Sequence, residues 1–296
     1  MNLLRNLFEF DKPQTNGELI FFKAFELFIV LGVTDLAWSW GFYILRISDV
    51  VLPLGIARYV DVTFMFDHLL SLVNAALITG LAVAGFFRIT KYAYLAALLL
   101  LHLQYAARYS LGEIPHSSNM LGMTLLGICL AMLLFSDDHH RRRFTLGFTY
   151  FFVGLGYTLS AFCKLIGTGI LWPDGRHLWM WINEKSIDAF AKTGVLDFNF
   201  PQELALSGHV IATFFLTVGL LTELFAFLVW WKKFRMPVLI GVVALHLGIY
   251  LVMNIFFTLS VYELVLLAFP WPAWLDWLTS RVSWMRILER VSIRYA

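Results

Sequence analysis

A single lysine inside a long apolar stretch is the first residue whose chemistry needs an explanation. Lys164 ends the segment Tyr157-Thr-Leu-Ser-Ala-Phe-Cys-Lys164 within the apolar residues 148–171, and Trp172-Pro-Asp-Gly175 follows. An ionisable residue inside a membrane-spanning helix is costly and marks a candidate functional site. Lys164 is therefore a candidate base. The alternative is a lysine whose amine extends along its apolar stem to the membrane surface.

Two sets of polar residues in later apolar stretches are spaced four apart, so that each set shares one helical face. The sets are His209, Thr213 and Thr217, and then His246, Tyr250 and Asn254. Threonines in membrane helices usually form interhelical hydrogen bonds. Two histidines together with Glu223 exceed what packing requires, because a buried acid needs either a partner or a proton.

His116 is the remaining candidate, in the short polar segment Glu113-Ile-Pro-His116-Ser-Ser-Asn119 that precedes an apolar stretch. On its own it is typical of a solvated loop histidine. We expect it on the same side of the membrane as Lys164, where an imidazole would assist proton transfer near neutral pH.

Polar residues in the N-terminal half have a simpler interpretation. Lys23 and Glu26 are three apart and can pair on one helical face. Ser71, Asn74 and Gln104 are each typical of the hydrogen bonds that hold membrane helices together.

The elements that must position these residues are predicted to be membrane helices. The chain has 296 residues, of which 60% are apolar and only 14% charged, and it contains several nearly uncharged runs. A helix needs about 20 apolar residues to cross a bilayer. We predict an all-α polytopic membrane bundle in one domain, residues 1–296, with about eight spans. They lie at roughly residues 18–45, 66–87, 92–108, 119–136, 145–167, 205–231, 236–256 and 258–278, where the last two could form one broken hairpin.

The distribution of positive charge predicts the orientation of these spans. Lys and Arg gather on one set of connecting segments, as in Arg141-Arg142-Arg143, and such segments face the cytoplasm. We therefore expect both termini to be cytoplasmic, with an amphipathic cytoplasmic tail at about residues 279–296. The location that we expect for this integral membrane protein is a bacterial inner membrane. The segment of about 172–204 lies outside, where residues 176–193 are predicted to form an amphipathic helix that ends at Gly194.

Composition and motifs exclude several function classes. The net charge of +2 gives no reason to expect nucleic acid binding. The sequence contains no His-Glu-x-x-His, no Cys/His cluster, no Gly-x-Ser-x-Gly and no glycine-rich phosphate loop, so we predict no metal site. The predicted partners are the lipid bilayer and a lipid-soluble small molecule, and a protein partner remains open.

The segment from Tyr157 through Lys164-Leu-Ile-Gly to Trp172-Pro-Asp-Gly175 resembles the lysine-Leu…Trp-x-x-Gly motif of the HTTM (horizontally transferred transmembrane) family. This is the membrane domain that vitamin K-dependent gamma-carboxylase shares with its bacterial relatives. Two further segments agree with it: Leu221-Thr-Glu223-Leu-Phe-Ala and Leu245-His246-Leu-Gly-Ile-Tyr-Leu-Val-Met-Asn-Ile-Phe. His116-Ser-Ser-Asn119 is similar to the family's Asn-His segment in a looser register.

The resemblance implies a role for each candidate residue. In the carboxylase, the matching lysine deprotonates reduced vitamin K, and oxygen then converts the cofactor to an epoxide through a strongly basic intermediate. Lys164 would be this base and His116 its assistant. Substrate-binding or supporting roles fall to Tyr157, Trp172, His209, Glu223, His246, Tyr250 and Asn254.

The same resemblance leaves substrate and cofactor open. The chain ends soon after the last predicted span and lacks the carboxylase's outer peptide-binding domain, so we do not expect peptide carboxylation. A reduced quinone such as a vitamin K-type hydroquinone is one candidate cofactor or substrate for a carboxylase-like or quinone-linked oxidoreductase. The alternative is a small-molecule or proton-coupled transport or binding protein, in which the two histidine sets line a path. A third alternative, a structural partner in a biosynthetic operon, requires nothing of Lys164.

Overall fold

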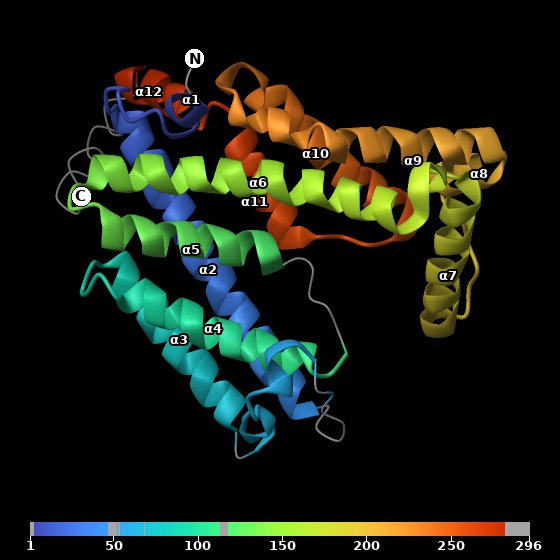
Figure 1. The fold of residues 1–296 in the computed structure, drawn as a ribbon, viewed down its shortest axis with the longest axis horizontal. Coiled ribbons are helices and arrows are strands. Elements are labelled where there is room, and N and C mark those ends of the chain that lie inside the picture. Colours follow the sequence, from blue (N-terminus) through green and yellow to red (C-terminus); the bar gives the residue numbers. More distant parts are fainter. Residues whose placement is uncertain (1–2, 47–51, 53, 68, 113–117, 282–296) are drawn as a thin grey trace. The chain divides into compact units, whose positions relative to one another are not determined.

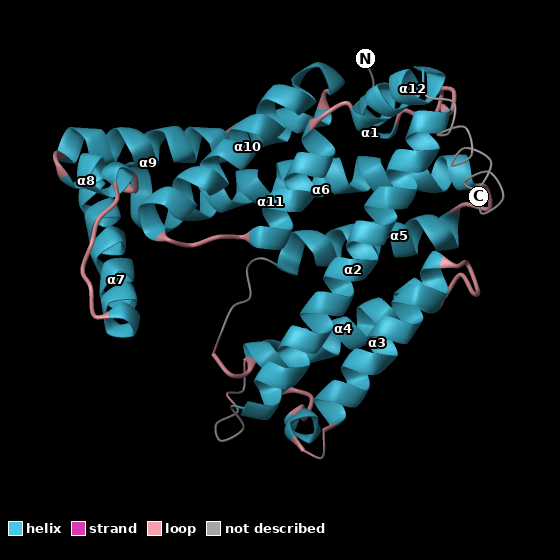
Figure 2. Cartoon of the chain, turned by 180° about the vertical axis from the view of Figure 1, so that it is seen from behind, coloured by secondary structure: helices cyan, strands magenta, loops and turns pink. Residues whose placement is uncertain are grey.

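The computed structural model describes residues 3–46, 52, 54–67, 69–112 and 118–281, and every regular element among them is a helix (Figures 1 and 2). The chain falls into two compact units. Unit 1 comprises residues 1–7 and 150–269, and unit 2 comprises residues 8–149 and 270–296. The all-α prediction is therefore confirmed for the described residues, and each unit is described by itself.

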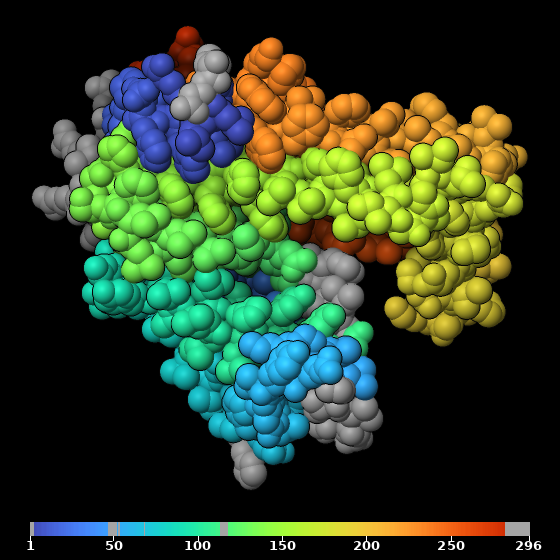
Figure 3. Space-filling model, in the orientation of Figure 1, coloured from blue at the N-terminus to red at the C-terminus, as the bar shows by residue number. Residues whose placement is uncertain are grey.

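Unit 2 is built on three packed helices, α2 (Asn16–Arg46), α3 (Leu70–Phe86) and α4 (Ala93–Tyr109). The space-filling view shows the side chains of α3 and α4 in continuous contact (Figure 3). The other helices of the unit are α5 (Asn119–Leu134), the first part of α6 (Asp138–Thr168), α12 (Trp271–Arg281), and the short η1 (Gly55–Arg58) and η2 (Thr63–Phe66).

Buried polar side chains in unit 2 hold these helices together, as the sequence predicts. The Ser71 hydroxyl donates to the Gly41 carbonyl at 2.9 Å, and the Gln104 amide donates to the Ala37 carbonyl at 2.9 Å. The Asn74 amide donates to the carbonyl of Leu100 on α4 at 3.2 Å. Helix carbonyls that accept from a neighbouring helix give such packing its specificity.

The predicted pair of Lys23 and Glu26 is confirmed, with Nζ and Oε2 3.3 Å apart. It is part of a larger network that the sequence did not reveal. The Glu26 carboxylate is fully buried and also accepts from Arg88 and, at 2.7 Å, from the Tyr94 hydroxyl. A buried carboxylate with several charge-assisted donors is well compensated, so this network ties α2 to the end of α3 and to α4.

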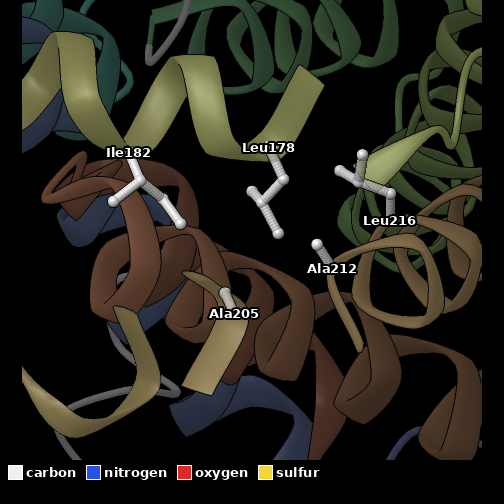
Figure 4. Close-up of a cluster of buried hydrophobic side chains, with 5 residues drawn as sticks. All are labelled: Leu178, Ile182, Ala205, Ala212 and Leu216. Carbon is white, nitrogen blue, oxygen red and sulfur yellow. The ribbon is translucent and has the colours of Figure 1, made fainter. Parts of the chain in front are cut away.

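Unit 1 carries the candidate site. It contains α1 (Leu3–Phe8), the second part of α6, η4 (Gly169–Leu171), α7 (Gly175–Thr193), α8 (Phe200–Leu206), α9 (His209–Leu224), η5 (Ala226–Trp230), α10 (Lys232–Met253) and α11 (Thr258–Ala268). In both ribbon views α7 runs crosswise to α9 and α10. A small apolar core joins α7 to α8 and α9 and consists of Leu178, Ile182, Ala205, Ala212 and Leu216 (Figure 4).

The predicted helix after Trp172 is confirmed as α7. The Asp174 carboxylate caps its start by accepting from the Arg176 backbone N–H, and Gly194 ends it with φ 71°. A left-handed residue after the last helical turn is the usual place for glycine. The exposed face of α7 includes Met180, Ile187 and Phe190, each about half exposed or more.

Eight spans are not confirmed. Three helical segments in the described part of the chain are long and apolar enough to cross a membrane, namely Asp138–Leu171, His209–Trp230 and Lys232–Met253. A fourth is added only if α11 and α12, which are broken at Phe269-Pro270, count as one span. Helices α3 and α5 are apolar but have 17 and 16 residues, short of the roughly 20 that a crossing requires.

Candidate functional site

The site is arranged along one face of α6. Tyr157, Ser160 and Lys164 are three and four residues apart, so their side chains project from the same side of the helix. The helix continues without interruption to Thr168, and Gly169, with φ 77°, follows it. Lys164 therefore lies one turn before the end of α6, in a part of the helix that is fully hydrogen bonded.

Lys164 forms an ion pair with Glu223, which lies in the last turn of α9. The Glu223 side chain is only 9% exposed, while that of Lys164 is 28% exposed. The Ser160 hydroxyl also interacts with the Glu223 carboxyl group. The Lys164 amine lies 4.9 Å from the centre of the Trp172 ring, a distance at which a cation interacts favourably with an indole.

The backbone around Glu223 is fixed by Thr158, which the sequence did not single out. The Phe227 backbone N–H donates to the Thr158 hydroxyl at 3.1 Å. The same hydroxyl lies 3.4 Å from the carbonyl oxygens of Glu223 and Leu224. These contacts satisfy backbone groups where α9 gives way to η5, and they hold Glu223 in register with Lys164.

A second polar pair lies further along the same face of α6. The Tyr157 hydroxyl and His246 Nε2 are 2.5 Å apart, and His246 comes from the middle of α10. The imidazole is 8% exposed, and the edge-on ring of Phe257 packs against it at 5.1 Å. The other ring nitrogen, Nδ1, is buried and has no hydrogen-bond partner among the described residues.

His209 and Thr213, which the sequence predicts to share a polar face of a membrane helix, lie on α9, and both side chains bind the start of α7. His209 Nε2 lies 2.8 Å from the Asp174 carboxylate, and the Gly175 backbone N–H donates to the Thr213 hydroxyl at 2.9 Å. Thr217 donates back to the carbonyl of Thr213. The third residue of this set thus bonds to its own helix.

Gly175 allows the start of α7 to pack closely against α9. A methyl group at Gly175 would lie 2.5 Å from the His209 carbonyl oxygen and 2.8 Å from the Ala212 side chain. Only glycine allows the two backbones to approach so closely. The Trp172-Pro-Asp-Gly segment thus has two structural roles, because Trp172 contacts the Lys164 amine and Gly175 packs on α9.

The Asp174 carboxylate lies where α7 meets α9 and accepts hydrogen bonds from Arg176 and His209. Hydrogen bonds from the Arg176 side chain and backbone, and then from His209, hold the pKa of Asp174 well below its usual range. The same partnership raises the pKa of Arg176. The ionised carboxylate also lies at the N-terminus of α7, where the helix dipole favours negative charge.

The remaining predicted site residues lie apart from these pairs or outside the described residues. Tyr250 is 46% exposed and packs on Phe256. Asn254 was expected to continue the face of His246, but it adopts φ 55° and ends α10 as its left-handed cap. His116 lies outside the described residues.

The described residues contain no group of three or more His, Cys, Asp or Glu side chains arranged to hold a metal ion. Searches of protein-family models, curated proteins and solved structures find no match to this chain. The fold itself therefore defines the class: an all-helical protein with several helices apolar enough to cross a membrane, in which two partly buried polar pairs connect α6 to α9 and to α10.

Sequence reasoning named Lys164, Glu223, Tyr157 and His246 but did not pair them. A helical wheel of α6 would have placed Tyr157 and Lys164 on one face, together with Ser160. Nothing in one sequence indicates which acid or imidazole on another helix meets them.

Proposed function

We propose that the chain is a membrane protein of the HTTM type that binds a lipid-soluble substrate with an acidic hydroxyl, such as a hydroquinone, beside Lys164. Lys164 acts as the base that removes the hydroxyl proton. The observation that carries this proposal is the pairing of Lys164 with a buried acid on a neighbouring helix.

The pair can generate a base without leaving a net charge in the membrane. The ammonium of Lys164 passes a proton to the Glu223 carboxylate, which gives a neutral amine and a neutral acid. Burial favours this exchange because each separated charge is costly in a low-dielectric environment. The free amine then takes the proton of the substrate hydroxyl and becomes an ammonium beside the new oxyanion.

The surroundings of Lys164 suit a flat aromatic substrate. The Trp172 ring lies over the amine, and the Trp181 ring lies 5.8 Å from that of Trp172. Aromatic rings stack on one another at such separations. A substrate ring beside Trp172 would present its hydroxyl to the amine.

The position of α7 supports a membrane setting. A helix that runs crosswise to membrane-crossing helices lies along the membrane surface, and α7 runs crosswise to α9 and α10. Its exposed residues Met180 and Ile187 would then enter the boundary between headgroups and acyl chains. A fluorophore at Met180 should be quenched by bromine-labelled lipid and be shielded from iodide in solution.

The test compares three proteins in detergent: wild type, Lys164→Met and Lys192→Met. Lys192 is an exposed lysine on α7 and serves as the matched control. Oxygen consumption with an added reduced naphthoquinone should be equal in wild type and Lys192→Met. Loss of a general base typically costs 10²–10⁴-fold, so Lys164→Met should fall by at least about 100-fold.

Full turnover by Lys164→Met would refute the assignment. The thermal transition of tryptophan fluorescence, measured on all three proteins, separates loss of the base from loss of the fold. Flux of a small molecule into sealed vesicles without any redox turnover would instead support the transport alternative.

A further inference from the structure

We propose that Tyr157 and His246 form the proton acceptor for the Lys164–Glu223 pair, so that His246 takes up the proton equivalent that Lys164 must release before it can deprotonate the substrate. This inference rests on the proposed function of Lys164. It assigns a role to a buried pair that the base itself does not require.

The short separation within the pair favours one of its two possible donors. The Tyr157 oxygen and His246 Nε2 are 2.5 Å apart. Hydroxyl donors reach about 2.5–3.0 Å from their acceptors, whereas N–H donors rarely come closer than about 2.7 Å. This favours the Tyr157 hydroxyl as the donor and Nε2 as the acceptor. A neutral imidazole whose Nε2 accepts carries its proton on Nδ1.

The Nδ1–H group of His246 takes no part in the bond to Tyr157. It is buried and has no partner among the residues that the structure describes. A buried donor without an acceptor costs roughly 1–3 kcal/mol of folding free energy. A histidine at this position therefore destabilises the fold compared with an apolar side chain. A proton-accepting histidine has a use for that group, because it takes a proton at one nitrogen and releases the other from the opposite one.

The two polar pairs lie along one face of α6. Tyr157 and Lys164 are seven residues apart on one face of α6, about 10 Å along the helix axis. Ser160 lies between them on that face and interacts with the Glu223 carboxyl group. Glu223 interacts electrostatically with the Tyr157 hydroxyl. One rotation of the Glu223 carboxyl, or one bridging water, would complete the path.

The transfer balances in protons and charge. Lys164 first gives a proton to Glu223, and Glu223 gives a proton to the Tyr157 oxygen while the Tyr157 proton moves to His246 Nε2. The Lys164 amine then takes the substrate proton, which restores the ammonium and the Glu223 carboxylate. The products are the substrate oxyanion and a His246 imidazolium.

The first part of the test reads the tautomer directly. In protein labelled with ¹⁵N-histidine, the signal that disappears or shifts in His246→Gln identifies His246. We expect this histidine to carry its proton on Nδ1 in the wild type. In Tyr157→Phe, which keeps the ring but removes the donor, the proton should distribute over both nitrogens. An Nε2–H tautomer in the wild type would overturn the proposal.

The second part separates transfer from packing. Glutamine at position 246 can still accept from Tyr157 but cannot relay a proton, so His246→Gln should lower kcat by about 100-fold while KM stays within about twofold. Leu247→Gln, at an exposed position one residue along α10, is the control for a new amide in this helix. A His246→Gln enzyme with wild-type kcat would overturn this inference, and if Lys164→Met remained inactive the proposed function would stand.

Discussion

Removing one member of the Lys164–Glu223 pair should destabilise the protein more than the loss of its atoms explains. Breaking a buried ion pair by deleting one partner usually costs about 3–5 kcal/mol, because the other charge stays behind unpaired. Here the cost should be lower, since the Lys164 side chain is 28% exposed and keeps the Trp172 ring as a neighbour. We expect about 2 kcal/mol for Glu223→Gln and a similar value for Lys164→Met.

The double variant measures the coupling energy between the Lys164 and Glu223 side chains. Lys164→Met combined with Glu223→Gln leaves no charge at the site, and neutral replacement of a buried pair is often close to neutral in stability. The double variant should therefore be at least as stable as either single variant, which corresponds to a coupling energy of about 2 kcal/mol.

The assay is reversible unfolding in mixed micelles, followed by tryptophan fluorescence for the wild type, both single variants and the double variant. Contacting residues are expected to be non-additive, whereas independent sites add within about 0.5 kcal/mol. Single-variant losses that simply add would mean that the two side chains do not share a proton or a charge. The base-generating step would then lose its physical support.

Three further predictions concern the packing of α7, the charge of Asp174 and the buried Glu26 network. Gly175→Ala should detach α7 from α9 and expose the 172–203 segment to protease. Gly194→Ala is the control, because Gly194 lies in open space at φ 71°. It should lower the unfolding free energy by only about 1 kcal/mol. Because the pKa of Asp174 is lowered in the folded protein, its contribution to α7 stability is present at neutral pH and is lost as the pH falls below about 4. Protease protection of α7 should fall with acidification in the wild type and stay flat in Asp174→Ala. Glu26→Gln should destabilise unit 2 by about 3 kcal/mol in thermal unfolding, because it leaves two cations without their carboxylate, and an unchanged midpoint would contradict the network.

The sequence predicted best those features that depend on residues close together in the chain. The bounds of α7 follow from an acidic cap at Asp174 and a glycine at position 194, which lie in the sequence where the helix begins and ends. The spacing of Lys23 and Glu26 predicted their pairing for the same reason. A contact within one helix depends only on the helical repeat, and that repeat is visible in one sequence.

The sequence predicted poorly where the determinants lie on different helices. His209 and His246 looked equivalent, each being the first residue of a set spaced by four. One pairs with a loop carboxylate and the other with a tyrosine inside the bundle. Asn254 was assigned to a helical face although asparagine readily adopts a left-handed conformation, which was the available signal for the end of α10.

Side chains at the start of α8 donate hydrogen bonds to carbonyl groups at the end of α10. Asn199 and Gln202 form a capping box at the start of α8, and their amide groups also donate to the carbonyls of Leu251 and Val252 in the last turn of α10. A helix terminus normally relies on water for these carbonyls, which is why it stays near the aqueous phase. Here side chains take the place of that water. Two carbonyls in the last turn of α10 therefore have side-chain partners in place of water where the helix meets the start of α8.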